Sequence, residues 1–266
     1  MELGVKFMKL NHIYNESCLV TLKRIKDNSI DTVITSPPYN MNLRIRNGKY
    51  CSRQIVKELT TKYDDFADNL DINEYNKFHS QVLSELLRVS KLVFYNIQLL
   101  TGNKRSVFKI IGDYSDYLKD IIIWDKGNAE PSIQSGVLNK RTEFILVFEK
   151  ENSISRKFKT AQFKRGTLED LWLIQRENNN LSSHKAIFPE KFVYKILSNF
   201  TNEKDIIYDP FIGTGSTAIV CKKMNRYFLG SEINENYVNV ALQRLLTEKL
   251  EPFNIQNQSI NQTTLF

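Results

Sequence analysis

Cysteine is scarce in this chain, with three residues among 266. Cys18, Cys51 and Cys221 are too few and too scattered for a disulfide framework, and no Cys/His spacing matches a zinc site. No apolar run approaches the roughly 18 residues that a membrane span needs, and the first residues lack the apolar core of a signal peptide. The sequence therefore predicts a soluble, cytoplasmic protein without a bound metal ion.

Acidic residues are outnumbered by basic ones, 30 against 37, and the formal net charge of +7 favours a polyanionic partner. The excess gathers in two stretches, 41–62 and 151–166, although each could also be an ordinary solvated surface. The residues that we expect to contact the partner are Arg44, Arg46, Lys49 and Arg53 in the first stretch, and Arg156, Lys157, Lys159, Lys164 and Arg165 in the second.

Apolar periodicity predicts alternating strands and helices, and the hydrophobic content of 41% favours one large domain, 1–250, followed by a polar tail, 251–266. Residues 150–183 are polar, basic and weakly periodic, which predicts an insertion rather than sheet. The expected strands are 31–35, 92–95, 120–124, 143–148, 206–208 and 227–230, and the expected helices are 18–25, 72–89, 189–199, 216–224 and 236–249.

A glycine-rich loop, Asp209 to Thr217, lies between an expected strand and an expected helix. Gly213 and Gly215 let the backbone approach a ligand, and the helix start offers free N–H groups to a carboxylate or a phosphate. Glu232 ends the next strand, where an acid can accept hydrogen bonds from both hydroxyls of a ribose. The pattern indicates a nucleoside-containing ligand; a purely structural turn is the alternative.

The rigid tetrapeptide Ser36-Pro37-Pro38-Tyr39 follows the expected strand 31–35. Its prolines stiffen an extended loop at a strand's carboxyl end, where open α/β sheets bind ligands. Ser36 Oγ and the Pro37 carbonyl can accept the two protons of an amino group, and Tyr39 can stack on a nucleobase. A proline-rich recognition segment is the alternative, which the preceding buried strand disfavours.

Together the two motifs resemble those of the beta class of amino DNA methyltransferases, in which the catalytic motif precedes the cofactor motif. The resemblance covers residues 11–250, and the run Asp-Pro-Phe-x-Gly-x-Gly-x-Thr matches at every fixed position. It implies a Rossmann-like α/β fold, with a seven-stranded, mostly parallel sheet, helices on both faces and a circularly permuted motif order. It also implies S-adenosylmethionine as the cofactor.

The resemblance assigns roles to individual residues. Where relatives often carry an acid and a glycine, this chain has Asn15-Glu16-Ser17, so Glu16 is the nearest substitute. His184 would add a contact over the methionine part of the cofactor, although Pro189 could equally mark an ordinary helix start. The catalytic residues would be Ser36, Pro37, Pro38 and Tyr39, and the other cofactor-binding residues Asp209, Phe211, Gly213, Gly215, Thr217 and Glu232.

The implied reaction is methylation of an exocyclic amino group on a base flipped out of double-stranded DNA, within a short specific sequence. Methylation of cytosine carbon 5 is disfavoured, because no cysteine here follows a proline. Ser36 favours cytosine N4 as the target, with adenine N6 open and an RNA or small-molecule methyltransferase more remote. The stretch 41–62 would close near the flipped base and 150–183 would recognise the target. A cognate restriction endonuclease and a second copy of the chain are further expected partners.

Overall fold

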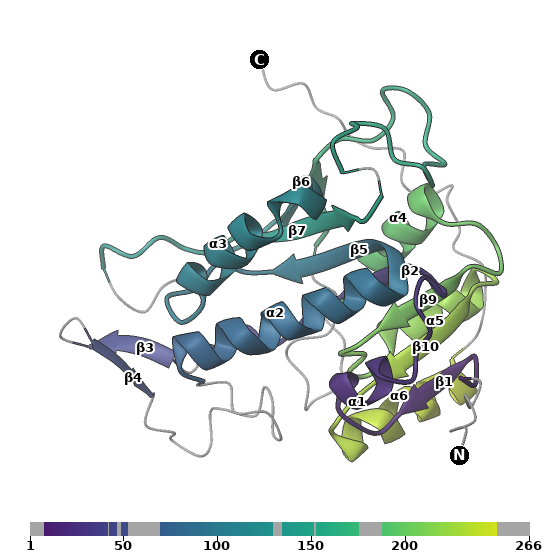
Figure 1. Cartoon of the computed structure of the whole chain (residues 1–266), viewed down its shortest axis with the longest axis horizontal. Coiled ribbons are helices and arrows are strands. Elements are labelled where there is room, and N and C mark those ends of the chain that lie inside the picture. The colour runs from purple at the N-terminus through teal and green to yellow at the C-terminus, as the bar shows by residue number, and fades with distance from the viewer. Residues whose placement is uncertain are drawn as a thin grey trace.

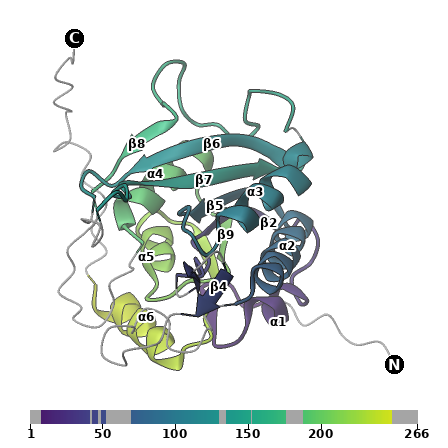
Figure 2. The ribbon, with the colours of Figure 1, turned by 90° about the vertical axis from the view of Figure 1, so that its left-hand side faces the viewer.

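A twisted sheet runs through the protein, with helices packed on both of its faces (Figures 1 and 2). The structure is a computed structural model, and of residues 43–46 and 49–52 it describes the backbone alone. The described residues are 8–41, 43–46, 49–52, 70–129, 135–151, 153–175 and 188–248.

Over the described residues, the main sheet has eight strands in the order β1-β10-β9-β2-β5-β7-β6-β8. β7 is antiparallel to β5 and β6, and the other neighbours are parallel. One edge, called here the carboxyl edge, therefore holds the carboxyl ends of the parallel strands and the amino end of β7. The strands are β1 (His12–Tyr14), β2 (Ile30–Thr35), β5 (Ser90–Ile97), β6 (Leu118–Asp125), β7 (Thr142–Glu149), β8 (Leu171–Leu173), β9 (Ile206–Asp209) and β10 (Tyr227–Ser231), with a separate hairpin of β3 (Leu43–Arg46) and β4 (Lys49–Ser52).

The helices divide between two apolar cores, one on each face of the sheet. Leu22, Leu83 and Val107 belong to one core, and Phe192, Ala218 and Val238 belong to the other. The expected mostly parallel α/β fold with helices on both faces is confirmed. The helices of the first core are α1 (Cys18–Leu22), α2 (Ile72–Val89) and α3 (Lys104–Asp113), those of the second are α4 (Glu190–Phe200), α5 (Ser216–Lys223) and α6 (Glu235–Thr247), and the short 3-10 helix η1 spans Ser115–Tyr117.

The longest helix has the bounds that its sequence predicts, 72–89. Its apolar positions recur at helical spacing, and Tyr75, Val82 and Leu86 are fully buried against the sheet. The Asp71 side chain accepts a hydrogen bond from the Asn73 amide at 2.9 Å and so caps the first turn. Local sequence signals alone therefore fix this element.

The implied count of seven strands is wrong, because the described residues alone contribute eight strands to the sheet. The additional strand, β8, lies in the segment 150–183, which was expected to stay out of the sheet. Trp172 at its centre is fully buried, and the strand pairs with β6 from Ile123 to Asp125. Burial of one large aromatic side chain and backbone pairing outweigh the polar flanks, so a strand of three residues forms without a periodic pattern.

The stretch 41–62, expected to be a loop, contributes the β3–β4 hairpin as far as Ser52, and residues 53–69 lie outside the described part of the chain. The polar tail 251–266 lies outside it as well. Among the described residues, no helix is long and apolar enough to cross a membrane.

Candidate active site

Strand register gathers polar side chains from four neighbouring strands at the carboxyl edge. Thr35 pairs with Tyr95, so Ser36 after β2 lies level with Asn96 of β5. β7 starts at this edge, and its Glu143 pairs with Trp124, close to the end of β6. The ends of β2, β5, β7 and β6 are neighbours in the sheet, so residues from four separate parts of the chain meet around Ser36.

The loop after β2 is held rigidly by hydrogen bonds from surrounding elements. The Tyr75 hydroxyl donates to the Pro38 carbonyl at 2.9 Å, and Asn103 Nδ2 donates to the Tyr39 carbonyl at 2.9 Å. Asn40 leaves the loop with a φ of 57° and donates to the carbonyls of Leu70 and Gly102. The expected stiffness of the proline loop thus has support from side chains on both flanks.

Ser36 and Tyr39 belong to a buried polar network. Their hydroxyl oxygens are 2.7 Å apart, and the Tyr39 hydroxyl donates to Glu143 Oε2 at 2.8 Å. Asn96 Nδ2 donates to the Tyr39 hydroxyl at 2.6 Å and to Glu143 Oε2 at 2.7 Å. Lys126 Nζ contacts Glu143 Oε1 at 2.9 Å, and both of these charged side chains are buried. Tyr39 itself is only 8% exposed, so this network fixes the direction of its ring.

The glycine-rich loop connects β9 to α5 through two left-handed backbone conformations, which favour glycine. Gly213 and Gly215 have positive φ angles of 52° and 87°. A Cβ on Gly215 would lie 2.8 Å from the Cβ of Ala241 on α6. Glycine is therefore required at position 215 both by its backbone conformation and by close helix packing.

Glu232 stands directly after β10 and faces this loop. Its Oε2 accepts a hydrogen bond from the Gly213 amide at 3.0 Å, and its Oε1 accepts one from the Asn234 amide at 2.9 Å. The carboxylate is thereby anchored beside the glycines, as the predicted ribose contact requires.

Asp209 at the end of β9 is fully buried, and its carboxylate accepts hydrogen bonds from Thr217 Oγ1 at 2.6 Å and from the Phe211 amide at 3.1 Å. Burial is the largest influence on this group and raises the pKa of Asp209 to about 7, against the lowering effect of those hydrogen bonds. A positively charged ligand nearby would favour its ionised form.

These residues fit S-adenosylmethionine. The space above Gly213 is open, since a Cβ built there would meet no atom within 4 Å. Within the described part of the chain, the buried hydroxyl of Ser216 at the start of α5 has no hydrogen-bond partner. A carboxylate for the ribose, open N–H groups at a helix start and an unsatisfied hydroxyl suit a ligand with a ribose and an amino acid part.

The two motifs lie on adjacent strands. β2 pairs with β9 in parallel, with Thr32 opposite Ile207 and Val33 opposite Tyr208. Tyr39 and Phe211 both pack in the core under α2, where the Phe211 ring lies 6.1 Å from the Phe78 ring. The geometry therefore brings the proposed methyl donor site next to the proposed acceptor site.

Two further expectations have different outcomes. Glu16 is engaged by Arg24 in an ion pair and by the Thr21 hydroxyl at 2.7 Å, so its carboxylate is already committed to the protein. His184 lies outside the described residues.

The two basic stretches lie at opposite edges of the sheet (Figure 1). The hairpin that carries Arg44, Arg46 and Lys49 follows the proline loop at the carboxyl edge, whereas Arg53 lies outside the described residues. The second stretch follows the carboxyl end of β7, and the Lys150 amide donates to the carbonyl of Lys91 at the start of β5. The structure does not bring the exposed basic side chains of this second stretch to Ser36; they are Arg156, Lys157, Lys159, Lys164 and Arg165.

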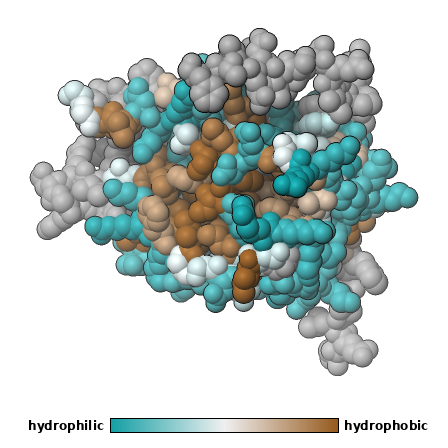
Figure 3. All heavy atoms as spheres, turned by 90° about the horizontal axis from the view of Figure 1, so that it is seen from above, coloured by the Kyte–Doolittle hydropathy of each residue, from teal (hydrophilic) through white to brown (hydrophobic). Residues whose placement is uncertain are grey.

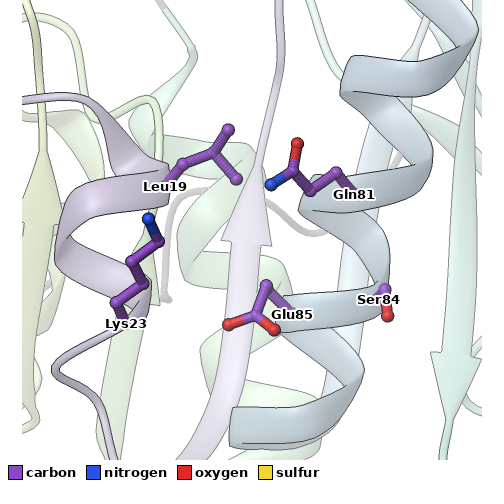
Figure 4. Close-up of a pocket in the computed structure, with 5 residues that line it drawn as sticks. All are labelled: Leu19, Lys23, Gln81, Ser84 and Glu85. Carbon is purple, nitrogen blue, oxygen red and sulfur yellow. The ribbon is translucent and has the colours of Figure 1, made fainter.

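A small cavity between α1 and α2 is lined by Leu19, Lys23, Gln81, Ser84 and Glu85, side chains of mixed character (Figure 4). Its charged residues, Lys23 and Glu85, oppose one another in sign, which favours no single class of ligand. Among the described residues, no group of three or more His, Cys, Asp or Glu side chains could hold a metal ion. Neither feature adds to the site at the carboxyl edge.

Sequence reasoning missed Asn96, Lys126 and Glu143. Glu143 opens an expected strand, and Lys126 follows another, but nothing in either segment shows that the two strands pair. The only local hint of this ion pair is that one expected strand begins with an acidic residue and another is followed by a basic residue.

The sequence matches the family model described as DNA methylase, which comprises N6 and N4 methyltransferases, over residues 30–243. Similar proteins include the Type II methyltransferase M.BglII of Bacillus subtilis, 28% identical over 93% of this chain and 72% of the relative. Another is the Type II methyltransferase M.HinfI of Haemophilus influenzae, 25% identical over 94% of this chain and 72% of the relative. The chain belongs to this DNA methylase family.

Solved structures share the fold. The cytosine-N4-specific PvuII DNA methyltransferase superposes with a TM-score of 0.67 at 16% identity, covering 96% of this chain and 90% of that one. The M1.HpyAVI–SAM complex superposes with a TM-score of 0.61 at 22% identity, covering 88% and 98%. The protein is an S-adenosylmethionine-dependent DNA amino-methyltransferase, and the resemblance to the beta class is confirmed.

Proposed function

We propose that this protein methylates the N4 amino group of cytosine at a specific site in double-stranded DNA. The observation that carries the proposal is the hydroxyl of Ser36, a neutral acceptor held one strand away from the cofactor loop. S-adenosylmethionine supplies an electrophilic methyl group when bound. Adenine N6 is the alternative, because either amino group presents two N–H donors and the geometry of Ser36 suits both.

The catalytic loop would act by orientation. An exocyclic amine is a poor nucleophile, since its lone pair is delocalised into the ring. Ser36 Oγ and the Pro37 carbonyl would accept the two amino protons and so direct the lone pair out of the ring plane. Tyr75 already donates to the Pro38 carbonyl, which favours Pro37 as the backbone acceptor.

The base would have to leave the duplex to reach this loop, at a cost of a few kcal/mol. Stacking on Tyr39 would return about 1–3 kcal/mol of that cost. Residues Asp209, Phe211, Gly213, Gly215, Thr217 and Glu232 would hold the cofactor, with Glu232 on the ribose and the start of α5 toward the methionine carboxylate. His184 would add its contact from the segment before α4.

Nucleoside mass spectrometry after reaction with duplex DNA tests this proposal. We expect N4-methylcytosine from duplex DNA and no product from RNA or free nucleosides. N6-methyladenine alone would replace cytosine by adenine as the target, and 5-methylcytosine would overturn the mechanism. The Ser36→Ala variant should lose most turnover and keep cofactor binding by calorimetry.

Several similar proteins are named Type II methyltransferases, and this supports a role in restriction and modification with a cognate endonuclease. DNA from cells that express the chain should then resist one endonuclease specificity, and sequencing that detects modified bases would reveal the recognised word. Among the residues whose side chains are described, Cys18 and Cys221 are buried and free, which supports a location in a reducing cytoplasm.

A homodimer is also part of the proposal. An apolar area faces the viewer in Figure 3, on the side of β6 and β8 that lies away from α4 (Figure 2). Side chains alternate along a strand, so the partly buried Ile121 and Ile123 share this face with Leu171 and Leu173, which are 54% and 65% exposed. Sedimentation equilibrium should show a dimer that the double variant Leu171→Lys, Leu173→Lys weakens; a monomeric wild type would remove the homodimer.

A further inference from the structure

The hydrogen-bond chain that ends at Ser36 has a fixed direction. Glu143, in its ion pair with Lys126, is a carboxylate and can only accept. The Tyr39 hydroxyl has one proton, which it donates to Glu143 Oε2 at 2.8 Å. Toward Ser36 the Tyr39 oxygen can therefore only accept, so the Ser36 hydroxyl is the donor across their 2.7 Å contact.

Asn96 reinforces that direction. Its side-chain nitrogen lies 2.7 Å from Glu143 Oε2, a position that an amide oxygen would avoid because of repulsion by the carboxylate. The same nitrogen donates to the Tyr39 hydroxyl at 2.6 Å. Tyr39 thus accepts from two groups and donates to one.

We propose that Glu143 is a positioning residue that turns Ser36 into a dedicated hydrogen-bond acceptor, acting through the hydroxyl of Tyr39. The inference rests on the proposed function and deepens it. The Ser36 proton is directed inward to Tyr39, and Asn96 Nδ2 approaches Ser36 Oγ only at 3.4 Å, so Ser36 Oγ keeps a lone pair for an amino group of the target base. Ser36 is partly exposed, while Tyr39, Asn96 and Glu143 are buried. Ser36 is therefore the end of this hydrogen-bond network that a substrate can reach.

The carboxylate also strengthens the acceptor. Charge-assisted hydrogen bonds are stronger than neutral ones, and hydrogen bonds in a chain polarise one another. Negative charge at Glu143 raises the electron density on the Tyr39 oxygen and, through it, on Ser36 Oγ. The neutral hydroxyl of Ser36 thereby becomes a stronger hydrogen-bond acceptor for the amino group, in a position where a carboxylate would otherwise accept better.

Lys126 balances the buried charge of Glu143, so a double variant can remove both charges together. Removing one member of a buried ion pair leaves an uncompensated charge, whereas replacing both with apolar residues of similar size is often neutral for folding. The double variant Lys126→Met, Glu143→Met removes the acceptor and both charges. The double variant Lys126→Met, Glu143→Gln keeps an acceptor oxygen without the charge.

Steady-state methylation of duplex DNA, calorimetric binding of S-adenosylmethionine and thermal melting test the proposal. We expect kcat to fall about tenfold or more in Tyr39→Phe and in the Met/Met variant. The fall should be smaller in the Met/Gln variant, because an acceptor at position 143 keeps the direction of the hydrogen bonds from Ser36 through Tyr39. The KM for DNA and the Kd for the cofactor should stay within about twofold of wild type. The control is Tyr114→Phe, which removes a tyrosine hydroxyl that donates to the Ser80 carbonyl on the helical layer and should leave kcat unchanged.

The outcomes separate this proposal from the proposed function. If Ser36→Ala abolishes methylation while Tyr39→Phe and both double variants keep wild-type kcat, the positioning role is overturned and the proposed function stands. A joint loss of melting temperature, cofactor binding and kcat in the double variants would indicate a structural role, and Tyr39→Phe, which deletes one oxygen, then decides. A wild-type protein that yields no methylated DNA overturns the proposed function itself.

Discussion

Two acidic side chains at the glycine-rich loop, Asp209 within it and Glu232 beside it, differ in their surroundings. Glu232 is anchored by two backbone amides beside open space, whereas Asp209 is enclosed under the loop. The first is suited to contact a ligand directly, and the second to shape the loop and respond to charge nearby.

Asp209 should make the stability of the protein depend on pH. Its pKa is about 7 in the folded protein against 3.8 for the unperturbed group, so the stability it contributes is complete below about pH 4 and is lost as pH rises through 7. At about 1.4 kcal/mol per pKa unit, the full effect is a few kcal/mol. Urea unfolding at pH 5 and pH 8 should show a larger loss for wild type than for Asp209→Asn. Parallel losses in the two proteins would contradict the shifted pKa.

Glu232→Ala should weaken binding of S-adenosylmethionine by about tenfold or more, because hydrogen bonds to a charged group contribute roughly 1.5–3 kcal/mol. Calorimetry measures the Kd directly. Glu235→Ala is the matched control, since this exposed acid lies three residues away in the first turn of α6. Equal affinity in wild type and Glu232→Ala would exclude the ribose contact.

For single residues, the sequence predicts those whose role follows from a short motif around them. Ser36, Tyr39, Gly215 and Glu232 each stand in a short motif with its own physical reason, and all four lie at the carboxyl edge. Asn96, Lys126 and Glu143 have no such motif, because their roles depend on the order and register of strands far apart in the chain.

The loop between β9 and α5 combines a left-handed backbone at Gly215 with close packing of this residue against Ala241 of α6. Gly215→Ala should destabilise the protein by about 2 kcal/mol or more, since a side chain at a φ of 87° is strained and would press on Ala241. Gly112→Ala is the control: this glycine lies in α3 with open space around it, and alanine favours helix there. Chemical unfolding should separate the two variants; equal stabilities would contradict the packing argument.

Elements with strong internal periodicity, such as α2, have the bounds that the sequence predicts. β1 and β8 have three residues each and form because a neighbouring strand offers backbone partners. No local pattern of three residues predicts such pairing, and the segment around β8 is dominated by exposed basic residues. Short edge strands are therefore where prediction from this sequence fails.

The charge distribution of the whole molecule predicts which face meets DNA. Each phosphate contact adds about 0.9 to the slope of log affinity against log salt concentration. Replacing Arg44, Arg46 and Lys49 with Gln should flatten that slope. The same change at Arg156, Lys157 and Lys159 removes equal charge at the opposite edge and should leave the slope near that of wild type.

Filter binding over a range of salt concentrations compares the two triple variants. A flattened slope in the second variant alone would move the DNA to the opposite edge and restore the recognition role first expected for 150–183. Flattening in neither would identify both stretches as solvated surface.

The position of β2 between β5 and β9 has a consequence for synthesis on the ribosome. β2 is translated early, but its neighbour β9 begins at Ile206, so one side of this central strand waits for most of the chain to emerge. Until then an apolar strand presents unpaired backbone groups, a state that favours aggregation. Nascent chains that stop before Ile206 should therefore depend on chaperones, and native structure should form only after β9 and β10 have left the ribosome.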